Sequence, residues 1–137
     1  MAYEQPLFDI TGYSSGDMSS NQYKLVLAST TNAADGVVLG PSSAGGKITG
    51  VWQGDSTASE YGKVRVLGVS KVQVSTGSAA ITRGSHLTGS TAAHGTVMVS
   101  TSTTGSQFIV GQALAAHASG SSGVIPVLLM PGWHDTP

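Results

Sequence analysis

From Tyr23 onward, apolar residues alternate with polar ones or gather in short runs, and clusters of Gly, Ser, Thr and Asn separate these segments. The clearest alternation is the stretch 63–74, where valines alternate with Lys, Arg and Gln on both sides of Gly68. A period of two sends successive side chains to opposite faces of a β-strand. The sequence therefore predicts an all-β chain, with strands at 23–28, 36–39, 47–53, 63–69, 71–74, 96–101, 107–114 and 124–130.

Short strands at intervals of roughly ten residues, with turn residues between them, are typical of a compact small barrel or sandwich. The chain has 137 residues, which suits one ordinary domain, and we expect residues 23–137 to form it. The segment Gln112 to Ala118, QALAAHA, contains helix-favouring residues and is ended by Ser119 to Gly123. We therefore expect at most one short helix.

Residues 1–22 differ from the rest of the chain and are predicted to be an extended N-terminal arm followed by a linker. A polar stretch, Ser14 to Asn21, follows the arm. Because apolar side chains are costly to leave in water, we expect the arm to pack on another surface. An ordinary first strand of the same domain is the alternative, since termini often pair into a sheet. The apolar set of the arm is Tyr3, Pro6, Leu7, Phe8, Ile10 and Tyr13.

Charged residues make up only 9% of the chain, against about 25% in an average soluble domain. Six basic and seven acidic residues provide no field that would attract a polyanion, so neither nucleic acid nor membrane is an expected partner. A surface with so few charges lacks a common defence against strand pairing and association. We therefore expect an oligomer, or a subunit docked on a larger assembly.

Catalytic and metal-binding motifs are not found in the sequence, and we expect no enzyme activity and no cofactor. The chain has no cysteine, its four histidines lack the spacing of paired metal ligands, and no Gly-x-Ser-x-Gly elbow occurs. The stretch Pro41 to Thr49 departs from a phosphate-binding loop, because Pro41 replaces the first Gly and Ile48 replaces the hydroxyl residue. Trp52 and Trp133 are predicted to pack in the core or at an oligomer interface, and the interface is our guess.

The order of segments from Lys47 to Gly132 resembles the capsid cement, or head decoration, proteins of tailed phages. The resemblance is carried by ITGVW (48–52), VRVLGV (64–69), AITRGSHLT (80–88), GTVMV (95–99), IVGQALAA (109–116) and VIPVLLMPG (124–132). The chain departs from that family in its low acidic content, its longer N-terminal arm and Ser85, where an acidic residue commonly follows the turn glycine.

The resemblance implies a non-enzymatic virion protein, often trimeric, that is made in the host cytoplasm. It would bind the outer capsid surface, beside other virion surface proteins, and stabilise contacts between major capsid protein subunits. The N-terminal arm is then the expected capsid contact, through Tyr3, Pro6, Leu7, Phe8, Ile10 and Tyr13. Two alternatives stay open: a glycan-binding or adhesive β-sandwich module, for which Trp52 and Trp133 would be the aromatic platform, and a hydrolase without a recognisable motif.

Overall fold

A computed structural model describes residues 4–14, 16–30, 36–40, 47–90, 92–101 and 105–136, and gives the backbone alone for 105, 106 and 133–136. The described residues contain nine strands and no helix, so the predicted all-β class is confirmed. The strands are β1 (Gln5–Ser14), β2 (Leu25–Ala28), β3 (Gly36–Leu39), β4 (Gly50–Trp52), β5 (Glu60–Val74), β6 (His86–Gly89), β7 (Val97–Val99), β8 (Gly105–Ala113) and β9 (Gly123–Thr136).

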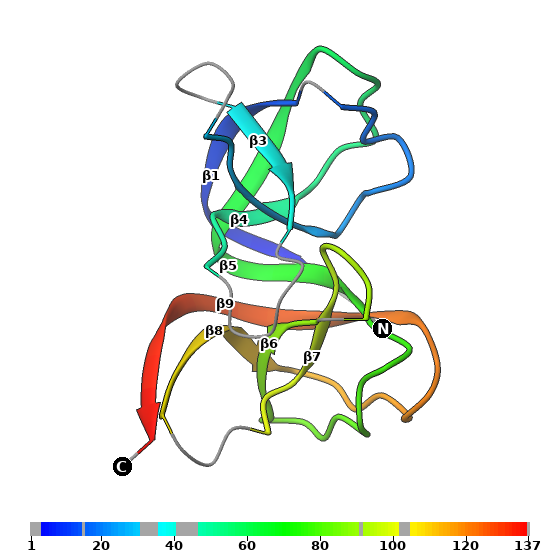
Figure 1. Cartoon of the computed structure of the whole chain (residues 1–137), viewed down its shortest axis with the longest axis vertical. Helices are drawn as coiled ribbons and strands as arrows, with labels where there is room; N and C mark the ends of the chain where they lie inside the picture. The colour runs from blue at the N-terminus through cyan, green and yellow to red at the C-terminus, as the bar shows by residue number, and fades with distance from the viewer. Residues whose placement is uncertain are drawn as a thin grey trace.

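All nine strands belong to one mixed sheet, in the order β1-β3-β2-β4-β5-β7-β6-β8-β9. Two additional pairings, β1 with β5 and β5 with β9, close this sheet on itself twice. Strands β1 to β5 thus form one small closed unit and β5 to β9 form another. Figure 1 shows the two units one above the other, with the long strand β5 running through both. The predicted small barrel is therefore present as two closures that share a strand.

Each closed unit has its own apolar core. The first is small and contains Met18, Val26, Val37, Trp52 and Val64, with Ile10 and Leu39 packed against it. The second lies mainly between the strands β5 to β9 and is larger. Its buried members are Leu25, Ile48, Val51, Val72, Val74, Ile81, Leu87, Val97, Phe108, Val110, Ala113, Ile125, Val127 and Leu129. Because β5 supplies residues to both cores, the two units are parts of one fold.

Strand β5 changes partners along its length. Its first half pairs with β1 on one edge and with β4 on the other, at Val51↔Arg65 and Trp52↔Val64. From Gly68 onward β4 is replaced by β9, which pairs with β5 as far as Val74. Two predicted segments, 63–69 and 71–74, are consequently one strand of 15 residues.

The structure differs from three sequence-based expectations about local structure. The segment 112–118 is not a helix: Gln112 and Ala113 end β8, and His117 forms an isolated bridge to Ile81. The extended arm is not confirmed, because Gln5–Ser14 is a strand of the sheet, which is the alternative that the sequence left open. The stretch after it is packed, since Met18 is buried and its N–H donates to the carbonyl of Ser56 at 3.0 Å.

Candidate functional site

The residues predicted to contact a capsid separate into two groups along β1. Pro6, Leu7 and Phe8 are exposed, whereas Ile10 packs against the first core. The half-buried Tyr13 lies against Tyr61 of β5, with the ring centroids 5.1 Å apart. Tyr3 lies outside the described residues. The first half of β1 therefore holds the part of the predicted set that is free to touch a partner.

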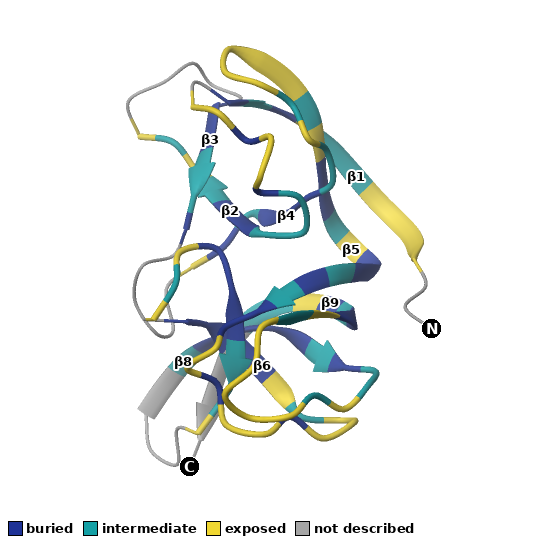
Figure 2. Cartoon of the chain, turned by 90° about the vertical axis from the view of Figure 1, so that its right-hand side faces the viewer, coloured by how far each residue is buried: buried dark blue, intermediate teal, exposed yellow. Residues whose placement is uncertain are grey.

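Two further exposed apolar side chains lie beside Leu7 and Phe8. Phe8 pairs with Leu67 of β5. Met130 of β9 directly follows Leu129, which pairs with Gly68, the residue after Leu67. The exposed fractions are 75% for Leu7, 54% for Phe8, 43% for Leu67 and 53% for Met130. Figure 2 shows these exposed segments following one another from β1 through β5 to β9. We call these four residues the β1–β5–β9 patch.

Irregular pairing between β1 and β5 explains why Leu7 and Phe8 face outward. The β1–β5 ladder has irregularities on either side of Phe8, so the alternation that buries Ile10 does not continue through Leu7 and Phe8. A β-bulge redirects side chains in this way. Next to them, Gly68 has a φ of +107°. The sheet is thus distorted where β1, β5 and β9 lie side by side.

Arg65 lies on β5 three residues before Gly68, and it is almost fully buried. Its Nε lies 2.9 Å from Asp9 Oδ1 and its Nη2 lies 3.3 Å from Asp9 Oδ2, which is a two-pronged ion pair. Its Nη1 lies 3.4 Å from Glu4 Oε1 and also donates to the carbonyl of Val69 at 3.2 Å. Both carboxylates belong to the β1 segment, so Arg65 joins that segment to β5 by charge as well as by backbone pairing.

Sequence reasoning missed Arg65, Leu67 and Met130 as members of this region. Strict alternation in 63–74 assigned Arg65 to a polar, solvent-facing row, yet its side chain is only 7% exposed. The sequence did contain a signal for Arg65: a basic residue inside a valine-rich strand, with Glu4 and Asp9 near the N-terminus as acidic partners for it. No sequence pattern marked Leu67 and Met130 as exposed, because their exposure depends on how β1 and β9 pair with β5.

Both tryptophans were predicted to pack in the core or at an oligomer interface, and the structure describes the side chain of Trp52 but not that of Trp133. Trp52 is fully buried in the first core, where its ring lies against Gly62: a Cβ there would come within 2.3 Å of the ring. Trp52 is therefore a core residue, unable to reach a second subunit or to stack on a sugar. The backbone of Trp133 pairs with Phe108 in the β8–β9 ladder, and its side chain lies outside what the structure describes.

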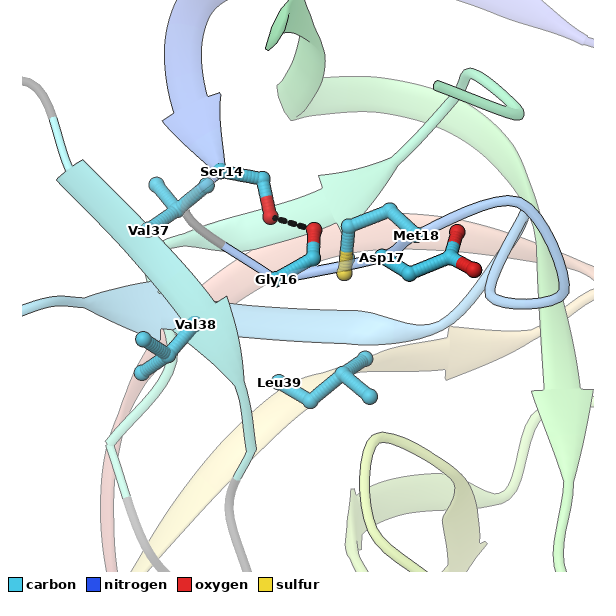
Figure 3. A pocket seen from close by; sticks show the side chains of 7 residues that line it. All are labelled: Ser14, Gly16, Asp17, Met18, Val37, Val38 and Leu39. Atoms are coloured by element: carbon cyan, nitrogen blue, oxygen red, sulfur yellow. Dashed lines mark hydrogen bonds between the residues drawn. The ribbon is translucent and has the colours of Figure 1, made fainter. Parts of the chain in front are cut away.

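A pocket of about 180 Å³ opens beside the first core, between the end of β1 and β3. Its lining consists of Ser14, Gly16, Asp17, Met18, Val37, Val38 and Leu39. In Figure 3 the Ser14 hydroxyl donates to the carbonyl of Gly16 at 2.8 Å, and the Asp17 carboxylate points away from the valines. The backbone N–H of Ser19, 2.9 Å from Asp17 Oδ1, lowers the pKa of that exposed carboxyl. The described walls are apolar and hold no acid–base pair.

Among the described residues, no group of three or more His, Asp or Glu side chains is arranged to hold a metal ion. The same part of the chain includes no helix long and apolar enough to span a membrane.

No protein-family model matches this chain, and no curated protein or solved structure is significantly similar to it.

Proposed function

We propose that this protein is a non-enzymatic cement protein of a tailed-phage capsid, which binds the outer surface of the head and stabilises contacts between major capsid protein subunits. The observation that carries the proposal is the β1–β5–β9 patch. Two of its four members, Leu7 and Phe8, are residues that the sequence pointed to as capsid contacts. Exposed apolar side chains that adjoin one another are a common mark of a protein-binding surface.

The low charge of the chain supports the same function. Clustered apolar contacts and few charges suit a protein that covers an existing surface, because such contacts need no opposed charge on the partner. A capsid offers many identical sites, and a bound oligomer contacts several of them at once. Each patch can then bind modestly while the assembled coat is held firmly.

A homotrimer is part of the proposal, because closed cyclic assembly would place three patches against neighbouring capsid subunits. Sedimentation at micromolar concentration measures this directly. A species of three chains is the expected result, whereas a monodisperse monomer contradicts the trimer.

The decisive experiment measures capsid occupancy by the variant Leu7→Ser/Phe8→Ser. Burying the exposed part of each side chain contributes about 1 to 1.5 kcal/mol, so losing both weakens a site by about 30- to 150-fold. The matched control is Val124→Ser, since Val124 is 41% exposed on β9 and lies six residues before Met130, about 20 Å along the strand. The control variant is expected to bind like the wild type.

Two outcomes contradict the proposal in different ways. Unchanged occupancy by Leu7→Ser/Phe8→Ser means that the patch is not the contact. Failure of the wild-type protein to bind heads that lack a cement protein, made from the phage that encodes this chain, means that the function is wrong. A glycan array probed with the wild type tests the adhesive alternative.

A further inference from the structure

The first half of β1 is held on the fold without burying any of its own side chains. All four residues from Gln5 to Phe8 are exposed. Their backbone pairs with β5 at Gln5↔Val69, Pro6↔Gly68 and Phe8↔Leu67, and the ladder is irregular on both sides of Phe8. A segment with exposed hydrogen bonds and no buried apolar contact is expected to open more readily than the core. Something else must keep it in place if the patch is to have a fixed shape.

The ion-pair cluster of Arg65 is suited to that task. Its side chain is 7% exposed, and its partners Asp9 and Glu4 are 17% and 31% exposed. A buried guanidinium is tolerated when it is paired, and removing its partner leaves an uncompensated charge out of water. Detaching the segment from Glu4 to Asp9 would remove both carboxylates from Arg65 at once. The cluster therefore opposes detachment at both ends of the exposed segment.

We propose that Arg65 is the positioning residue of the capsid-binding patch: through Asp9 and Glu4 it fixes the first half of β1 on β5, so that Leu7 and Phe8 are held beside Leu67. This inference rests on the proposed function and names the residue that organises its surface. Holding the contact residues in their bound arrangement before binding reduces the ordering cost of association. Arg65 itself is buried and acts through β1.

The first test needs no capsid and measures amide hydrogen exchange in the full-length protein. The variant Glu4→Gln/Asp9→Asn keeps the shape of both side chains and removes their charge. Exchange at Leu7, Phe8 and Asp9 is expected to quicken by about tenfold or more, while β8 and β9 stay unchanged. Asp55→Asn is the matched control, because it removes an exposed carboxylate elsewhere in the chain. Unchanged exchange in β1 of the double variant overturns the inference.

The second test asks whether the loss of capsid binding in Glu4→Gln/Asp9→Asn comes only from the displaced first half of β1. Gln5 and Val69 are directly opposite each other in the antiparallel ladder, at a separation that a disulfide can span. The chain has no other cysteine, so Gln5→Cys/Val69→Cys forms a single defined staple. Glu4→Gln/Asp9→Asn is expected to lower capsid occupancy by about tenfold, and adding the oxidised staple is expected to restore it.

Reduction of the staple should abolish the rescue. Reduced occupancy that the oxidised staple does not restore overturns the positioning role, because the charges would then matter for another reason. If the wild type itself fails to bind heads, the proposed function and the positioning role fall together. Amide exchange in β1 separates the two failures, because it reports whether the ion pairs of Arg65 hold β1 even when no capsid is bound.

Discussion

Gly68 is the residue at which β1, β5 and β9 come together, and its lack of a side chain is a requirement of the fold. A Cβ at this position would lie 2.4 Å from the carbonyl oxygen of Gln5 and 2.6 Å from the backbone nitrogen of Leu7. Its φ of +107° is also disfavoured for any residue with a side chain. Gly68 thus allows β1 to lie close against β5, directly beside the proposed binding surface.

Replacing Gly68 by Ala is expected to lower the free energy of unfolding by about 2 to 4 kcal/mol, from backbone strain together with the clash against β1. Gly84→Ala is the matched control: Gly84 has a φ of +92°, but a Cβ there would meet nothing within 4 Å. Gly84→Ala should lower the free energy of unfolding by about 1 kcal/mol, from backbone strain alone. Urea denaturation measures both, and equal losses would show that contact with β1 contributes nothing.

Arg65 and Trp52 show what residue-level reasoning from the sequence can reach. The sequence predicts the wrong location for Arg65 and leaves two locations open for Trp52. Arg65 was assigned to solvent by alternation and is buried, because two acids from β1 pair with it. Trp52 was predicted to lie in the core or at an interface and lies in the core, because Gly62 leaves room for its ring. Both outcomes depend on strands that are distant in sequence.

Segments rich in valine were the elements that the sequence predicted best. The predicted segment 36–39 agrees with β3, and the predicted segments 63–69 and 71–74 lie within β5. Burial alternates as expected from Lys71 to Val74, where the two valines are buried and Lys71 and Gln73 are half-buried. No strand was predicted at His86–Gly89, which is β6, because the segment has no apolar alternation. Its pairing with β7 and β8 makes it a strand. The segment 112–118 has helix-favouring residues, but ladder pairing with β9 overrides that weak preference.

Strand β1 is the element whose role the sequence left undecided, and its two halves are expected to respond differently to truncation. The described residues 4–8 are all exposed, so deleting residues 1–8 should lower the free energy of unfolding by about 1 kcal/mol while capsid occupancy is lost. Deleting residues 1–13 also removes Ile10 and the pairing of β1 with β3, which opens the first closed unit. Its loss of stability should exceed about 3 kcal/mol.

Urea denaturation and capsid occupancy, measured on both truncated proteins, check this difference. Equal stability of the two truncated proteins would contradict the division of β1 into an exposed half and a packed half. Full capsid saturation by the protein lacking residues 1–8 would remove Leu7 and Phe8 from the proposed contact.

At the scale of the whole molecule, two closed units sharing β5 were beyond the reach of the sequence. Period-two patterns indicate which residues face a core, but they do not say which strands pair when the pairs are far apart in the chain. The closures β1 with β5 and β5 with β9 are both of that kind. One consequence is that the N-terminal strand and β9 both pair with β5 around Gly68, which is what assembles the patch from distant segments.

Attachment of the whole protein to a capsid is expected to resist salt. The chain has six basic and seven acidic residues, and the exposed side chains of the patch are all apolar. At about 1 M salt, screening acts within roughly 3 Å, so a contact made by charge pairs at the surface would weaken strongly. An apolar contact would not, and the ion pairs of Arg65 are buried enough to be largely protected. Capsids decorated in dilute buffer and then moved to about 1 M sodium chloride should therefore keep most of their bound protein after sedimentation.

The variant Leu7→Ser/Phe8→Ser provides the comparison, and it is loaded at a higher concentration to compensate for its weaker binding. Its remaining attachment at high salt shows whether charge contacts also hold the protein on the capsid. Wholesale release of the wild type at high salt would refute an apolar, backbone-mediated attachment and point instead to the few charges outside the patch.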